Sequence, residues 1–211
     1  MENIVVITGD IIGSRKVENE SYDNLLYTLE TTLQLVASKF GKVKYDIYRG
    51  DSFQVIIPEI QSAIKIALLI RLALKSEDKS FDARLSIGIG EYDLNRSYVK
   101  RSTGEAYILS GTGIDKLKNQ NFVIYTNNPK FQARISLLTK FVDSTLTELT
   151  QKQSEVMYKY FTSASTEKAH DLIAESMGTT RENITQILNK GKYRLLEEYI
   201  DTINNSLKEF Y

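Results

Sequence analysis

Strand-like and helix-like stretches alternate along the first 126 residues in the order β-α-β-β-α-β-α-β. Residues 3–8 form a continuous β-branched run, which is typical of a strand buried on both faces, and residues 21–40 repeat apolar side chains at helical spacing. Strands are expected at 3–8, 42–49, 52–57, 82–91 and 122–126, and helices at 21–40, 60–75 and 104–117, with a further helix from Pro129 past Phe141. This order is that of the split βαβ, ferredoxin-like folds, an α+β class with the first strand and the hairpin in one antiparallel sheet and the helices on one face.

The character of the sequence changes near residue 145, after which the strand patterns end. Helices are expected at 150–161, 167–177, 181–189 and 192–207. We therefore predict two domains, an α/β domain over residues 1–145 and an all-α domain over residues 146–211.

Composition excludes several classes of site. The chain of 211 residues has 27 Lys+Arg and 27 Asp+Glu, so attraction to nucleic acid or to an acidic membrane has to come from a local patch. The absence of cysteine excludes thiolate sites, and a single histidine excludes a multi-histidine zinc site. The N-terminus reads as a strand, and the longest apolar stretch, residues 60–74, contains Lys65 and Arg71. We expect a cytoplasmic protein that makes no membrane contact.

Two aspartates follow strand-like segments. Asp10 comes after the first strand, and Asp51 lies at the tip of the hairpin. If these strands are neighbours, both carboxylates lie at one edge of the sheet, where they repel unless a cation joins them. Mg²⁺ takes one or two protein carboxylates and completes its shell with water and phosphate oxygens, so the pair predicts a Mg²⁺ or Mn²⁺ site suited to phosphoryl transfer. The alternative is that each aspartate is an ordinary turn residue.

Small and basic residues beside the aspartates are candidates for contacts to a nucleotide. Glycines allow a bulky ligand to approach the backbone, and serine and arginine bind phosphate oxygens. These candidates are Gly13, Ser14, Arg15 and Gly50. Arg96, Lys100 and Arg101 lie in a polar loop, residues 92–102, and either reach phosphates or are simply solvated.

Three motifs carry a resemblance to known families. Residues 10–13 (Asp-Ile-Ile-Gly) resemble the Asp-Ile-x-Gly motif of class III nucleotide cyclases. Residues 49–53 (Arg-Gly-Asp-Ser-Phe) are similar to the hairpin motif of those enzymes and of GGDEF diguanylate cyclases, and residues 85–90 look like the strand that follows in both. The match covers residues 3–126. The whole chain looks most like the bacterial SatD family, which implies a cyclase-like domain followed by a helical region.

The resemblance implies roles for particular residues. Asp10, Asp51 and the carbonyl of Ile11 correspond to the metal ligands. Thr112 and Lys116 stand where class III cyclases have a catalytic asparagine and arginine, and Ile47 stands where they have a base-selecting lysine. The resemblance therefore retains the metal-binding half of the pattern and places Lys116 near a nucleotide. Because class III sites form across a dimer, it also implies a homodimer.

Residues 172–188 have the pattern of a helix-turn-helix, with Ala174, Gly178, Ile184 and Ile187 at the required spacing and Thr180 able to cap the second helix. The run resembles the helix-turn-helix of LuxR-type transcription regulators and of sigma-factor region four. In this interpretation four residues read DNA bases and three bind phosphates. The base-reading candidates are Arg181, Asn183, Thr185 and Gln186, and the phosphate-binding candidates are Lys190, Lys192 and Arg194.

The charge of this region leaves an alternative open. Residues 151–211 carry 8 Lys/Arg against 9 Asp/Glu, so the basic footprint that usually marks a DNA-binding domain is absent, and a helical bundle that docks a partner protein fits the same pattern. For the whole chain, our first hypothesis is a regulatory protein that binds a nucleotide and DNA or a partner. The alternatives are an active Mg²⁺-dependent nucleotidyl cyclase and an interaction protein without a ligand.

Overall fold

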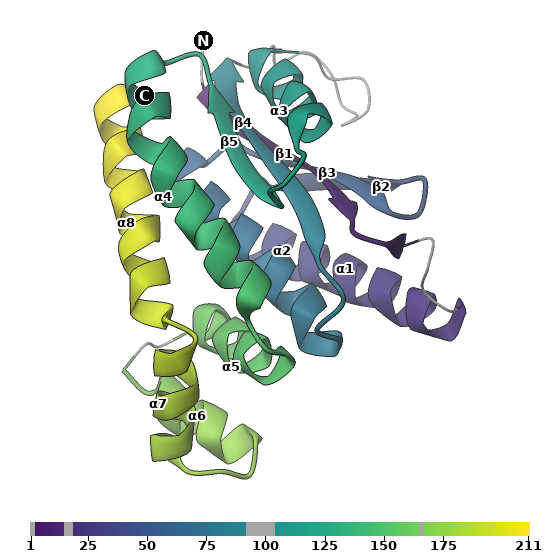
Figure 1. Cartoon of the computed structure of the whole chain (residues 1–211), viewed down its shortest axis with the longest axis vertical. Coiled ribbons are helices and arrows are strands. Elements are labelled where there is room, and N and C mark those ends of the chain that lie inside the picture. Colours follow the sequence, from purple (N-terminus) through teal and green to yellow (C-terminus); the bar gives the residue numbers. More distant parts are fainter. Residues whose placement is uncertain (1–2, 15–18, 92–103, 165–166) are drawn as a thin grey trace.

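The computed structural model describes residues 3–14, 19–91, 104–164 and 167–211. Its centre is a five-stranded mixed sheet with the order β2-β3-β1-β4-β5, visible in Figure 1. The strands are β1 Asn3–Ile11, β2 Lys44–Tyr48, β3 Ser52–Ile57, β4 Ala83–Glu91 and β5 Phe122–Thr126. Neighbouring strands are antiparallel except β4 and β5, which are parallel.

Helices account for most of the remaining described chain. They are α1 Asn19–Lys39, α2 Ala63–Glu77, α3 Glu105–Lys116, α4 Pro129–Glu148, α5 Gln151–Thr162, α6 Ala169–Ser176, α7 Arg181–Lys190 and α8 Tyr193–Phe210, with a 3₁₀ turn, η2, at Ile60–Ser62. The predicted order of elements and the mixed α+β class are confirmed. Within the described ranges, no helix combines the length and the apolar character needed to cross a membrane.

Helices cover both faces of the sheet, so the expectation of helices on one face is wrong. Helices α1 and α2 pack on one face, where Val5, Ile7 and Ile87 belong to the main core. Helix α3 packs on the other, which we call the α3 face, where Ile4 and Val6 form a second apolar cluster with Ile56 and Ala106 (Figure 1). The β-branched run of β1 needs cover on both sides, which explains the second layer.

Helix α4 seals the outer edge of β5. The Gln132 side-chain amide donates to the Ile124 carbonyl at 2.9 Å and accepts from the Thr126 amide at 3.1 Å. A residue of a parallel neighbouring strand makes this same pair of bonds, so Gln132 occupies the place of a further strand. The Asp143 carboxylate also accepts from the Asn121 amide at 2.9 Å. These contacts protect an edge that would otherwise pair with another chain.

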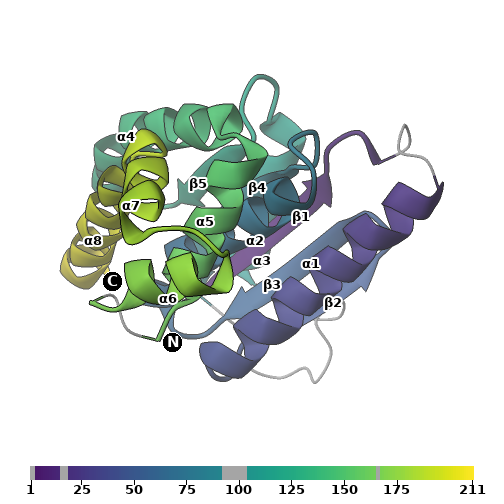
Figure 2. The ribbon, with the colours of Figure 1, turned by 90° about the horizontal axis from the view of Figure 1, so that it is seen from below.

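The C-terminal helices continue the main core. Helix α5 lies against α2 and leads into α6 and α7, while α8 returns beside α4 (Figures 1 and 2). One cluster of buried apolar residues includes β1 at Ile7, α2 at Leu68, α5 at Met157 and α8 at Ile203. The predicted division between residues 145 and 146 falls inside α4, and two separate domains remain a prediction.

A buried ionic cluster joins α2, Asp82 just before β4, and α4. Arg71 of α2 is fully buried; it donates through Nε and Nη2 to Asp82 at 2.7 and 2.6 Å and through Nη1 to Asp143 at 2.7 Å. Lys75 Nζ lies 3.9 Å from Asp82 and donates to the Thr147 carbonyl at 3.1 Å. Burial opposes the charge of Arg71, but hydrogen bonds and the charges of Asp82 and Asp143 raise its pKa overall.

Candidate metal and nucleotide site

Asp10 lies near the end of β1, and Asp51 lies in the turn just before the neighbouring strand β3. Strand β1 continues to Ile11, so Asp10 lies inside the strand rather than after it, opposite Ser52 of β3. The Ile11 amide donates to the Asp51 carbonyl at 2.9 Å, in the turn that precedes β3. Facing residues of antiparallel strands have Cα atoms roughly 5 Å apart, so the backbones of Asp10 and Asp51 are close.

Asp10 is held by an arginine that the sequence did not single out. Arg84 lies opposite Asp10 on β4, and its Nε donates to the two carboxylate oxygens at 3.0 and 3.1 Å, while Nη2 bonds to Oδ2. The side chains of Arg84 and Asp10 are 43% and 24% exposed, respectively, so the pair stays open to solvent. The hydrogen bond to Asp10 raises the pKa of Arg84. The only sequence signal was the position of Arg84 on the polar face of its strand.

Asp51 has different partners. Ser14 Oγ donates to its carboxylate at 2.7 Å, and Ser52 Oγ donates at 3.3 Å. Gly13 and Gly50 have φ angles of +71° and +79°, in the left-handed region that favours glycine, and so allow the two tight turns that bring Ser14 to Asp51. Gly13, Ser14 and Gly50 are therefore gathered beside Asp51, whereas Arg15 lies outside the described residues.

These donors suit a hard cation. Carboxylate and carbonyl oxygens are the ligands that Mg²⁺ prefers, and a nucleotide-bound ion needs only one or two protein carboxylates. Among the described residues, no group of three or more His, Cys, Asp or Glu side chains is arranged to hold a metal, so a cation here would rely on substrate oxygens. Asp10 and Asp51 would also have to leave their present partners, Arg84 and Ser14.

A polar strip on the α3 face leads away from Asp10. Gln54 Nε2 donates to Thr8 Oγ1 at 3.3 Å, and Thr8 Oγ1 lies 2.9 Å from Ser110 Oγ of α3. Burial raises the pKa of the Tyr48 phenol; Arg49 opposes this shift, while Asp46 and Asp10 add to it. The sheet around Asp10 therefore offers hydroxyl and amide groups to a polar ligand.

Lys116 does not contact the aspartates. It ends α3, with its ammonium 6.0 Å from the centre of the Tyr125 ring. Within residues 110–113, Gly113 serves packing, because a Cβ there would lie 2.0 Å from Ser86 Oγ, whereas a Cβ at Gly111 would meet no atom within 4 Å. The basic residues of the loop at 92–102 lie outside the described part of the chain.

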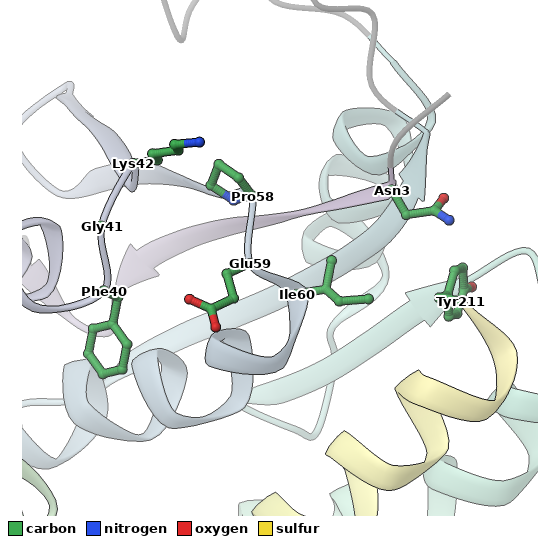
Figure 3. Close-up of a pocket in the computed structure, with 8 residues that line it drawn as sticks. All are labelled: Asn3, Phe40, Gly41, Lys42, Pro58, Glu59, Ile60 and Tyr211. Atoms are coloured by element: carbon green, nitrogen blue, oxygen red, sulfur yellow. The ribbon is translucent and has the colours of Figure 1, made fainter.

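A cavity of about 740 Å³ lies at the other end of the sheet (Figure 3). It is bordered by Asn3, where β1 begins, and by Pro58, just after β3 ends, together with Glu59, Lys42 and Tyr211. Asp10 and Ser52 lie at the opposite ends of the same two strands. This cavity is therefore separate from the aspartate pair.

Helices α6 and α7 are joined by the predicted short turn. Gly178 has φ +60°, and Thr180 caps α7 by accepting from the Asn183 amide at 3.2 Å. Ala174 and Ile184 are buried, which confirms that these two residues face inward. Both helices also contact α5.

The candidate DNA-reading residues occupy different surroundings. Asn183 and Gln186 are exposed, and Arg181 lies 3.4 Å from Asp171 of α6. Thr185 instead turns toward α6, where its hydroxyl lies 2.8 Å from His170 Nδ1 and donates to the Arg181 carbonyl. The phosphate-binding candidates Lys190, Lys192 and Arg194 are all exposed. Thr185 therefore does not face outward with the other candidate DNA-binding residues.

His170 should make folding pH-dependent. It packs edge-on against Tyr160 and Tyr193, and burial together with the charge of Arg181 lowers its pKa. A lowered pKa means that the folded state favours the neutral ring, so its stabilisation is complete above about pH 6.5 and declines as the pH falls below that value.

Replacing His170, the only histidine in the chain, tests this pH dependence. Urea unfolding of the wild type and of His170→Gln, measured from pH 7.5 to pH 5, should show the wild type losing stability relative to the variant as the pH falls. Parallel curves would mean that His170 has the same pKa in the folded and unfolded states.

No protein-family model matches the chain, and no curated protein matches it.

Proposed function

We propose that this chain is a regulatory protein that binds Mg²⁺ or Mn²⁺ with a nucleoside triphosphate at Asp10 and Asp51. We propose further that α6 and α7 form a helix-turn-helix that contacts duplex DNA. The observation that carries the proposal is the adjacency of Asp10 and Asp51 at one end of two neighbouring strands, joined through the Ile11–Asp51 backbone bond. The resemblance to the SatD family and to cyclase domains supports the same assignment.

The roles of the residues follow from their charge and position. Asp10, Asp51 and the Ile11 carbonyl would hold the cation, which when bound neutralises phosphate charge. Without a cation, Arg84 balances the charge of Asp10. Once Asp10 turns to a cation, the guanidinium of Arg84 is free to bind a phosphate oxygen, for which its planar donor fork is suited.

A sensing role fits the chain better than a catalytic one. Thr112 and Lys116 replace the asparagine and arginine of class III cyclases, and Lys116 lies against Tyr125. The site is also tied to the C-terminal helices. The Ile12 amide donates to the Asp82 carbonyl at 2.9 Å, and the Asp82 carboxylate belongs to the buried Arg71 cluster, which reaches α4.

The test is ligand-dependent melting. With each nucleoside triphosphate and Mg²⁺, the wild type should melt higher, by roughly 5–10 °C at a ligand concentration of 100 Kd. Asp10→Asn and Asp51→Asn should lose this rise, each measured against its own ligand-free melting temperature. Asp201→Asn, on the exposed side of α8, is the matched control and should keep it. If no triphosphate raises the wild-type melting temperature, the proposed site is wrong.

Two further measurements separate the alternatives. Release of pyrophosphate by the wild type, abolished in Asp10→Asn, would replace the sensor with an enzyme. Binding to duplex DNA at low salt should weaken as salt rises and should be reduced in Gln186→Ala and Lys190→Ala. Absence of DNA binding at low salt would leave partner docking as the role of α6 and α7.

A further inference from the structure

Helix α4 has an apolar surface on the side that faces away from the sheet. Leu137 and Phe141 are 62% and 65% exposed, and Leu138 beside them is 40% exposed. The opposite side of the same helix is already used, because Phe131 and Ile135 are fully buried in the core. Large apolar side chains gathered on one exposed helix face mark an interaction surface more often than isolated ones do.

The exposed residues of α4 follow a coiled-coil spacing. The stripe consists of Lys130, Arg134, Leu137, Phe141, Ser144 and Glu148, separated by 4, 3, 4, 3 and 4 residues. Such spacing keeps side chains on one line along a helix and is the pattern by which two helices pack. The apolar pair lies at the centre of the stripe, with a basic end and an acidic end.

This stripe is complementary to itself when two copies run antiparallel. A two-fold axis midway between Leu137 and Phe141 sets Leu137 against the partner's Phe141 and Lys130 against the partner's Glu148. Each contact then occurs twice, as an isologous interface requires. A parallel arrangement would instead set like charges against each other.

The charges at the helix ends favour the same partner. Lys130 lies in the first turn of α4 and Glu148 is its last residue, which is the reverse of the arrangement that stabilises a single helix. An antiparallel second copy corrects this, because Lys130 then lies beside the C-terminal end of the partner helix and Glu148 beside its N-terminal end.

We infer that two copies of this chain associate through α4, with the two helices antiparallel. Within the stripe, Arg134 is the residue that also contacts α8, where it pairs with Glu209 and lies 4.9 Å from the centre of the Phe210 ring. The stripe on α4 includes neither Asp10 nor any residue of α7. It therefore does not depend on the nucleotide proposal.

Sedimentation equilibrium over a range of protein concentrations tests the inference. The wild type should dimerise, and Phe141→Glu should weaken association by at least tenfold, with circular dichroism confirming that the variant is folded. Ile108→Glu is the matched control, since Ile108 is 70% exposed on α3, and it should associate like the wild type.

Exchanging the end charges gives a second, independent measurement. Lys130→Glu and Glu148→Lys should each weaken association, and the double variant should restore it, because the opposite charges meet again. A wild type that stays monomeric up to roughly 1 mM would overturn the inference. Loss of the dimer in Ile108→Glu but not in Phe141→Glu would also overturn it, and would move the interface to the α3 face.

Discussion

Arg71→Met is expected to lower the free energy of unfolding by about 3–5 kcal/mol, because it removes one partner from a buried ionic cluster. Asp82 and Asp143 would remain buried with their main cationic partner gone, and only Lys75, 3.9 Å from Asp82, would stay near. Urea unfolding followed by circular dichroism measures the loss.

Arg181→Met provides the matched control, because Arg181 lies outside the proposed dimer stripe. It removes the same side chain from the exposed pair with Asp171, where solvent screens the charges, so the loss should be far smaller. Equal losses in the two variants would show that the Arg71 cluster contributes no more than a surface pair.

The Arg71 cluster also connects the candidate site to the C-terminal half. Its carboxylate partner Asp82 accepts a backbone hydrogen bond from Ile12, two residues after Asp10. Its other partner, Asp143, belongs to the helix whose outer face carries the proposed dimer stripe. The buried Arg71 cluster therefore bridges Ile12, in the segment that follows β1, and α4.

Local patterns predicted the elements and one of the two faces of the sheet. In β4, apolar residues alternate with small or polar ones, and the apolar residues Leu85, Ile87 and Ile89 lie in the main core. Thr180, which was predicted to cap the second helix of the helix-turn-helix, caps α7 by accepting from the Asn183 amide three residues along the chain. Patterns of this kind can be predicted from the sequence because they depend only on residues a few positions apart.

The partners of the charged groups had no such local signal. Arg71 meets Asp82 and Asp143 at separations of 11 and 72 residues, and Arg84 meets Asp10 at a separation of 74. Only the register of β1 against β4 reveals the contact between Arg84 and Asp10. Likewise, helical spacing put Thr185 near the outer face of α7, but the way α7 packs on α6 turns its hydroxyl toward His170.

The cover of the α3 face was hidden for a related reason. What marks this face in the sequence is the lack of side chains at Gly88 and Gly90 of β4, which leaves room for α3 to approach the sheet. Helix α3 itself has few large apolar residues that would predict its burial. A glycine in a strand is consistent with a bulge, a bend or a close approach, and the sequence alone does not choose among them.

Gly88→Ala is expected to destabilise the fold by roughly 3 kcal/mol, at the upper end of the usual cost of overpacking. The added Cβ would lie 2.1 Å from the Ala106 carbonyl oxygen and 2.5 Å from the Ser110 amide nitrogen. Both are backbone atoms of α3, so no rotamer change relieves the clash and the helix itself has to move away from the sheet. Thermal and urea unfolding measure the loss.

Gly111→Ala makes the same chemical change within α3 with the opposite expected sign. A Cβ at Gly111 meets no atom within 4 Å, so alanine should stabilise the helix by about 0.5–1 kcal/mol. A destabilisation of similar size in both variants would mean that an added methyl group costs as much where the structure leaves open space as where it meets α3, and the close approach at Gly88 would then not explain the loss. The predicted difference in sign follows from contact alone, because Gly88 is pressed against α3 and Gly111 has open space beside it.

The movement of α3 away from the sheet in Gly88→Ala would also separate Ser110 from Thr8. This variant should therefore disturb the polar strip beside Asp10 as well.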